Sequence, residues 1–279
     1  MEKFPKASQR RVCRLLGVHR STVWRQDQRS CAHTNPVVDE VLAGRIKSII
    51  EEFPTFGYRR VWAILRFRDK ILVNKKKVYR ILRLNHWLTR YRKHTPRPRV
   101  SQWVSQVDGS NQRWAVDITH VACGADGWGH LVAVIDCFDR QIVGYEFALR
   151  GRAVEAERAL EEACLNRFGL VYPKDQENRL MLRSDNGLVF QSRRFRASSR
   201  QYGLSQEFIT PYTPQQNGLI EGFFRSLKEE CVWLDNFRSF VEARTAINEW
   251  IRYYNEDRPH QALGYRSPCQ VAPQQMMAA

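Results

Sequence analysis

The sequence predicts an α/β fold in which a mixed sheet is flanked by helices, preceded by small all-α modules of the helix-turn-helix type. Two observations lead to this fold class. The first third of the chain shows helical periodicity, whereas residues from about 111 onward alternate β-rich apolar runs with helices. The charge divides at the same place: residues 1–100 hold 25 Lys and Arg against 7 Asp and Glu, and residues 101–279 hold 20 against 22.

This charge asymmetry favours a DNA-binding N-terminal region joined to a nearly neutral domain. The alternative is a basic, solvated surface without a partner. Hydrophobic residues make up 43% of the chain, which excludes disorder throughout. The sequence has no run of 18 apolar residues and no signal-peptide pattern, so we expect no membrane partner and a cytoplasmic location, at the nucleoid when DNA is bound. Seven scattered cysteines without a C-x-x-C pair indicate reduced thiols.

Residues 1–30 form the first predicted module, a short helix-turn-helix-like segment. Gly17 separates two short helical runs. Ser21 and Thr22 can cap or open the second, which would enter a DNA major groove, and Arg20 is a candidate DNA contact. The predicted apolar face of the first helix consists of Val12, Leu15 and Leu16.

Residues 36–88 form the second predicted module, a helical DNA-binding domain, and a basic linker with two prolines follows at 89–107. Asn74 is a natural N-cap for the helix NKKKVYRILR. The apolar positions of that helix are Val78, Ile81 and Leu82, and those of the module's first helix are Val41, Leu42, Ile46, Ile49 and Ile50. The candidate DNA contacts here are Arg59, Arg60, Lys75, Lys76, Lys77 and Arg80.

Residues 108–235 form the predicted α/β domain, and 236–279 a C-terminal helix and tail. The runs RWAVDITHVAC, HLVAVIDCF and QIVGYEFAL indicate three antiparallel strands in a meander. A helix follows at Ala153–Phe168. The remaining predicted elements are the strand RLMLRSD, a helix around Ser192–Tyr202, the strand LSQEFIT, and two helices in IEGFFRSLKEECVW and FVEARTAINEWIRYYN.

Three acidic residues stand where an ordinary core would not place them. Asp117 interrupts the first strand, Asp185 ends the fourth, and Glu221 lies in the first turn of a helix. Carboxylates that converge from several elements suit Mg²⁺ or Mn²⁺, and two such ions can promote phosphodiester chemistry. Each residue also has an ordinary explanation: Asp117 could pair with Arg113 or Arg183, Asp185 could cap a turn, and Glu221 could be solvated.

Taken as a set, these motifs resemble those of a known family. WAVDIT, RSDNG and QQNGLIEGFFRSLKEE contain the acids; 35 residues separate Asp185 from Glu221, and Lys228 follows Glu221 by seven positions. FGYRRVWAILR and YNEDRPHQALGYRSP provide two further blocks. The chain resembles the transposases of bacterial insertion sequences, of the type encoded by the downstream frame of two-frame elements, whose catalytic core is similar to that of retroviral integrases.

The resemblance implies a ribonuclease H-like fold and metal-dependent DNA 3′-end cleavage and strand transfer. It implies that Asp117, Asp185 and Glu221 are catalytic ligands of Mg²⁺ or Mn²⁺, with two ions per site. The implied partners are terminal inverted repeats and target DNA, further copies of the chain, and the upstream-frame protein as partner or fusion. The alternatives are a non-catalytic DNA-binding regulator with a decayed core, and a structure-selective nuclease of the same fold.

Helix spacing adds two candidate DNA contacts. Glu221, Arg225 and Lys228 are spaced i, i+4, i+7 and share one helix face, so Arg225 and Lys228 would lie near the same phosphates. The alternative for Lys228 is pairing with Glu229 or Glu230. The remaining motif residues have smaller predicted roles. Asn186 and Gly187 shape the turn of Asp185, and Asp136 and Asp139 are turn residues. No role follows for Arg258 or His260.

Overall fold

The computed structural model describes residues 8–21, 39–89, 107–169, 179–210 and 213–273. The chain divides into two units, Met1–Lys47 and Ser48–Ala279, and each is considered by itself. Within the described residues, no helix is long and apolar enough to cross a membrane. The cysteines of this part, Cys31 being outside it, are free thiols.

The first unit contains helix α1, Gln9–Leu15, which begins where Ser8 Oγ accepts a hydrogen bond from the Arg11 N–H at 3.3 Å. The prediction of an apolar, buried face on this helix is wrong. Leu15 and Leu16 are 80% and 70% exposed, and Cys13 is the buried side chain. The second helix predicted for this module lies mostly outside the described residues.

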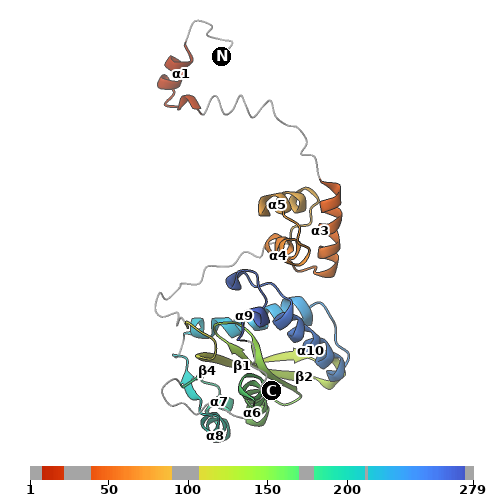
Figure 1. Cartoon of the computed structure of the whole chain (residues 1–279), viewed down its shortest axis with the longest axis vertical. Coiled ribbons are helices and arrows are strands. Elements are labelled where there is room, and N and C mark those ends of the chain that lie inside the picture. The colour runs from red at the N-terminus through yellow and green to blue at the C-terminus, as the bar shows by residue number, and fades with distance from the viewer. Residues whose placement is uncertain (1–7, 22–38, 90–106, 170–178, 211–212, 274–279) are drawn as a thin grey trace. The chain divides into compact units, whose positions relative to one another are not determined.

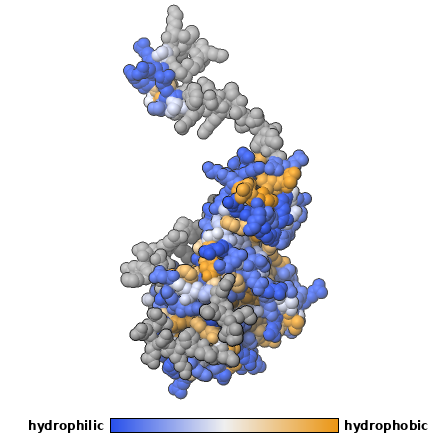
Figure 2. Space-filling model, in the orientation of Figure 1, coloured by the Kyte–Doolittle hydropathy of each residue, from blue (hydrophilic) through white to orange (hydrophobic). Residues whose placement is uncertain are grey.

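The helical segment that follows contains α3, Glu40–Glu52; α4, Tyr58–Ala63, which continues as a π-helical turn over Ile64–Arg68; and α5, Lys75–Leu84. Two predictions for α5 are confirmed. Asn74 accepts a hydrogen bond from the Lys76 N–H at 2.9 Å, and the predicted apolar positions are buried. In α3, Val41 is 87% exposed, so its assignment to the apolar face is wrong. Figure 2 shows an apolar area among hydrophilic residues on the visible face of this segment.

A five-stranded sheet forms the centre of the larger unit, with strand order β3-β2-β1-β4-β5 (Figure 1). The first three strands form the predicted antiparallel meander, and β4 and β5 extend it in parallel. Antiparallel neighbours need only short connections, whereas the parallel ones require the helical crossovers that the sequence contains. The strands are β1, Arg113–Ala122; β2, Trp128–Asp136; β3, Ile142–Ala148; β4, Met181–Ser184; and β5, Ser205–Phe208.

Helices cover both faces of this sheet. The helix predicted at Ala153–Phe168 is present as α6 with those bounds. The other helices are α7, Leu188–Gln191; α8, Arg193–Gln201; α9, Gly218–Leu227, which continues as a π-helical turn over Lys228–Val232; and α10, Phe240–Glu256. Short 3₁₀ turns lie at Gly124–Asp126, Pro214–Asn217, Gln261–Leu263 and Pro268–Gln270.

The two faces of β1 enter different apolar clusters because successive side chains point to opposite sides of a strand. Trp114 and Val116 pack with buried residues of α6 and α8. Ala115 and Val121 pack with buried residues of α9 and α10. Gly144 on β3 allows α6 to approach closely, since a Cβ there would lie 2.3 Å from the Ala159 carbonyl oxygen. The odd-numbered residues on either side of Asp117 in β1 therefore face α9, the helix that carries Glu221.

Candidate active site

Asp117 lies within β1, opposite Ala133 of β2 and half-buried. Its Oδ1 accepts a hydrogen bond from the Ile118 N–H at 2.8 Å. The two arginines that the sequence offers as partners of Asp117 contact another acid. Arg113 and Arg183 both lie within 3.2 Å of Glu207. The charges that act on Asp117 are negative ones, from Asp185 and Glu221.

Asp185 follows β4 directly, in the turn that the sequence predicts. Its Oδ1 accepts a hydrogen bond from the Gly187 N–H at 2.8 Å, so the carboxylate does cap its turn. A carboxylate has further lone pairs, and this cap does not exclude a ligand role. A Cβ at Gly187 would come within 2.8 Å of the same Oδ1, so a side chain there would displace the carboxylate. Asn186 holds the turn to the end of β5 through its Nδ2, which donates to the Ile209 carbonyl at 3.0 Å.

Glu221 lies exposed in the first turn of α9. Phe223 and Phe224 are buried beneath the helix and fix which side of it faces outward. Arg225 is exposed and Lys228 half-buried. Lys228 is the first residue of the π-helical turn and follows directly on α9, which ends at Leu227. Glu230, one of its predicted partners, pairs with Arg258 and Arg60.

The charges of Asp185 and Glu221 act on Asp117. Burial, and after it the negative charges of these two acids, raise the pKa of Asp117 to about 6, against the hydrogen bond from Ile118. Carboxylate oxygens are ligands that suit a divalent cation. Across the described residues, no group of three His, Cys, Asp or Glu side chains is close enough together to hold one ion.

Comparisons with known proteins identify the family of the chain. An HTH-like domain model matches residues 38–95, and two integrase core domain models match residues 108–214 and 202–268. The chain is 31% identical over 257 residues to the transposase InsD of insertion element IS2A/D/F/H/I/K from Escherichia coli, covering 90% of this chain and 83% of the relative. The InsD transposase of IS2D from Escherichia coli strain K12 gives the same values. The chain belongs to the insertion-element transposases. These are polynucleotidyl transferases of the DDE type, with an integrase core of ribonuclease H-like fold.

Solved structures give weaker likenesses. The catalytic core of HTLV-2 integrase in complex with magnesium is 18% identical, with a TM-score of 0.41, and the match covers 58% of this chain and 97% of that one. The simian T-cell lymphotropic virus intasome in complex with PP2A regulatory subunit B56 gamma is 16% identical, with a TM-score of 0.45, over 83% of this chain and 76% of that one.

The structure separates the predicted DNA contacts of the transposase into two groups. Lys76 and Arg80 are exposed on α5, four residues apart and therefore on one face. Arg20 is exposed in the other unit. Lys77 is half-buried on α5, and it has interactions within the protein.

The remaining three basic residues contact other parts of the same unit. The Nζ of Lys75 lies 4.1 Å from the ring centre of Trp62 and 4.7 Å from that of Tyr265. Arg59 donates to Gln261 at 3.3 Å, and Arg60 forms an ion pair with Glu230 at 2.7 Å. Lys75 and Arg59 thus join the helical segment to the C-terminal block, residues 254–268, and Arg60 joins it to the π-helical turn after α9. The sequence did not predict this role.

Asp139 lies in the turn after β2, as predicted, whereas Asp136 is the last residue of β2, and both are fully buried. Oδ1 of Asp136 accepts from the Phe138 N–H at 2.8 Å, and Asp139 pairs with Arg167 at 2.7 Å. Burial and the charge of Asp139 raise the pKa of Asp136. These contacts give both acids structural partners between the β2–β3 turn and α6.

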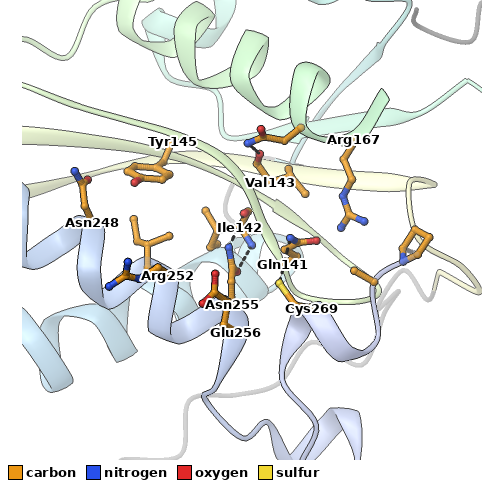
Figure 3. A pocket seen from close by; sticks show the side chains of 14 residues that line it. Gln141, Ile142, Val143, Tyr145, Arg167, Asn248, Arg252, Asn255, Glu256 and Cys269 are labelled. Atoms are coloured by element: carbon orange, nitrogen blue, oxygen red, sulfur yellow. Dashed lines mark hydrogen bonds between the residues drawn. The ribbon is translucent and has the colours of Figure 1, made fainter. Parts of the chain in front are cut away.

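A cavity of about 510 Å³ lies beside the edge strand β3, and none of the three acids lines it (Figure 3). Asn255 faces Ile142 there: its Oδ1 accepts from the Ile142 N–H and its Nδ2 donates to the Ile142 carbonyl, both at 2.9 Å. Asn166 donates to the Val143 carbonyl at 3.0 Å, and Glu162 accepts from the Tyr145 N–H at 2.6 Å. Side chains thus bond backbone groups of Ile142, Val143 and Tyr145 on this edge.

Proposed function

We propose that the transposase binds the terminal inverted repeats of its element and performs metal-dependent 3′-end cleavage and strand transfer at Asp117, Asp185 and Glu221. The observation that carries this proposal is that two carboxylates, Asp185 in the turn after β4 and Glu221 in the first turn of α9, both act electrostatically on Asp117 of β1. Negative charge beside a half-buried carboxylate is costly to the fold unless a cation balances it.

In this proposal the three carboxylates hold Mg²⁺ or Mn²⁺, with two ions per site. Bound divalent ions supply an activated attacking oxygen and stabilise the leaving oxygen in phosphodiester chemistry. Asp117 contributes a carboxylate fixed by its own strand, and Gly187 leaves room for that of Asp185.

Two surfaces are proposed to bind DNA. Arg225 and Lys228 project from the face of α9 that bears Glu221 and would contact phosphates near the scissile bond. Lys76 and Arg80 on α5, together with Arg20 and Lys77, would contact the element ends. We leave Arg59, Arg60 and Lys75 out of this set, because their contacts with Gln261, Glu230 and the rings of Trp62 and Tyr265 engage them within the protein.

Assembly is part of the same proposal. Cleavage and joining of two element ends require more than one active site, so we propose a homo-oligomer on DNA, with the upstream-frame protein as a partner or fusion. Its place of action would be the cytoplasm, at the nucleoid.

The experiment is incubation of the protein with its own element ends and Mg²⁺ or Mn²⁺, followed by electrophoresis of nicked and joined products. Metal-dependent nicking at the 3′ end followed by joining is the expected result. Binding without cutting would instead indicate a DNA-binding regulator, and cutting without joining a structure-selective nuclease.

A further inference from the structure

Arg183 is a buried arginine in the apolar strand β4, two residues before Asp185. A buried guanidinium needs several partners to offset its desolvation. Nε and Nη2 of Arg183 donate to the two carboxylate oxygens of Glu207, at 3.1 and 3.2 Å. Nη1 donates to the backbone carbonyl of Gln216 at 3.0 Å. One side chain therefore contacts both β5 and the turn that leads into α9.

The Gln216 carbonyl stands five residues before Glu221, in the 3₁₀ turn Pro214–Asn217. The side chain of Gln216 forms two hydrogen bonds with Thr210. Its Oε1 accepts from the Thr210 N–H at 2.8 Å, and its Nε2 donates to Thr210 Oγ1 at 3.3 Å. The turn before Glu221 is thus hydrogen-bonded at its backbone to Arg183 and at its side chain to Thr210.

Glu207 extends these contacts to the strand of the first acid. Its Oε2 lies 3.2 Å from Nε of Arg113, which is on β1 four residues before Asp117. Arg183, Glu207 and Arg113 therefore connect the elements that carry Asp117, Asp185 and Glu221.

We infer that Arg183 is a positioning residue of the catalytic site, which holds the turn before Glu221 against the strand that carries Asp185. The inference rests on the proposed assignment of the three acids as metal ligands. The planar guanidinium serves three acceptors in fixed directions, whereas a lysine at this position would keep the charge but lose that geometry. Arg183 acts through the backbone and need not touch DNA or metal.

The test measures Mn²⁺ binding to the full chain without DNA, by electron paramagnetic resonance of free Mn²⁺, and then DNA cleavage as a function of Mn²⁺ concentration. Arg183→Lys should raise the Mn²⁺ dissociation constant by about 10–100-fold, the usual effect of losing a residue that orients metal ligands. Saturating Mn²⁺ should restore much of the cleavage rate. The matched control is Arg113→Lys, which also touches Glu207 but not the turn before Glu221, and its effect should fall below that range.

A second variant keeps the test informative where Arg183→Lys folds poorly. Gln216→Ala leaves the carbonyl that Arg183 contacts but releases the turn from Thr210, and it should weaken Mn²⁺ binding to a smaller extent. Unchanged Mn²⁺ affinity in both variants would overturn the inference, and so would a lowered melting temperature with unchanged affinity. An Asp185→Asn protein that still cleaves DNA would overturn the proposed ligands themselves, and with them the role of Arg183.

Discussion

Arg258 and Glu230 form a buried two-point ion pair. Nε of Arg258 lies 2.8 Å from Oε2 of Glu230, and Nη2 lies 2.7 Å from Oε1. Nη2 also donates to Ser226 Oγ at 3.2 Å, and Arg60 approaches the same Oε1 at 2.7 Å. Glu230 follows Glu221 by nine residues along α9 and its π-helical continuation. The pair of Arg258 and Glu230 therefore connects the C-terminal block to the helix that carries Glu221.

Removal of Arg258 should therefore destabilise the protein. Arg258→Met leaves Glu230 buried with Arg60 alone, and we expect a loss of about 3–5 kcal/mol in the free energy of unfolding. Arg60→Met should cost about 1 kcal/mol, because the Arg60 side chain is 32% exposed. Urea unfolding measures both, with the exposed Arg252→Met as the control. Equal losses for Arg258→Met and Arg252→Met would contradict the role given to the buried pair.

Substitution of the acids should separate chemistry from binding. Asp117→Asn, Asp185→Asn or Glu221→Gln removes charge at nearly constant shape, so each should reduce cleavage and joining by more than about 100-fold. Binding to element ends, measured by gel shift, should stay close to that of the unchanged protein. A variant that cuts at the normal rate would not be a ligand.

Lys228 should contact DNA as a point charge. Lys228→Ala should lower the joining rate about tenfold, in line with loss of one charge-assisted hydrogen bond, without a change in Mn²⁺ binding. Lys228→Arg should keep much of the activity, because a phosphate accepts either cation. Crosslinking from position 228 to the terminal nucleotides checks the contact. If no crosslink forms and the alanine variant joins normally, Lys228 is a solvated residue.

Lys76 and Arg80 should contribute to the salt dependence of DNA binding. Each phosphate contact adds about 0.9 to the slope of log affinity against log salt. The double variant Lys76→Ala, Arg80→Ala should therefore lower that slope by about 1.8 in the full chain. Arg244→Ala, an exposed arginine on α10, provides the control. An unchanged slope would remove α5 from the DNA-binding surface.

His260 should make the protein sensitive to mild acid. Burial, together with the charges of Arg258, Arg140 and Arg60, lowers the pKa of His260 to about 3. Below about pH 6.5 the unfolded chain takes up a proton at this residue and the folded chain does not, so the free energy of unfolding falls as the pH falls. Between pH 6.5 and 5 this dependence reaches at most about 1.4 kcal/mol per pH unit.

A His260→Gln variant tests this by difference. The other histidines are the same in both proteins, so the pH dependence that the substitution removes belongs to His260. Identical pH profiles of unfolding free energy for the two proteins would show that His260 protonates in the folded state as it does in water.

Local patterns predicted local structure well. The cap at Asn74, the bounds of α6 and the turn of Asp185 depend on residues within a few positions of one another, and the structure has them as predicted. Apolar periodicity also identified the buried face of α5. It failed for Leu15, Leu16 and Val41, because a periodic apolar residue is buried only where another element covers it.

The contacts that organise the site could not be predicted in the same way. Arg60 and Glu230 are 170 residues apart, and Arg183 and the Gln216 carbonyl are 33 apart. Such pairs leave no spacing pattern, and a backbone carbonyl acceptor has no sequence signature. The available signal was an arginine within the apolar strand RLMLRSD, because a buried charge requires a partner. Asp117, Asp185 and Glu221 are proposed ligands that the spacing of the sequence motifs identifies.

The side chains along β3 limit how copies of this transposase can associate. An uncovered edge strand offers its backbone to a strand from another molecule, which leads to sheet extension or aggregation. Here Asn255, Asn166 and Glu162 already bond the backbone groups of Ile142, Val143 and Tyr145. A second copy would have to displace all three side chains before it could add a strand, so an oligomer at this edge would have to form through side chains.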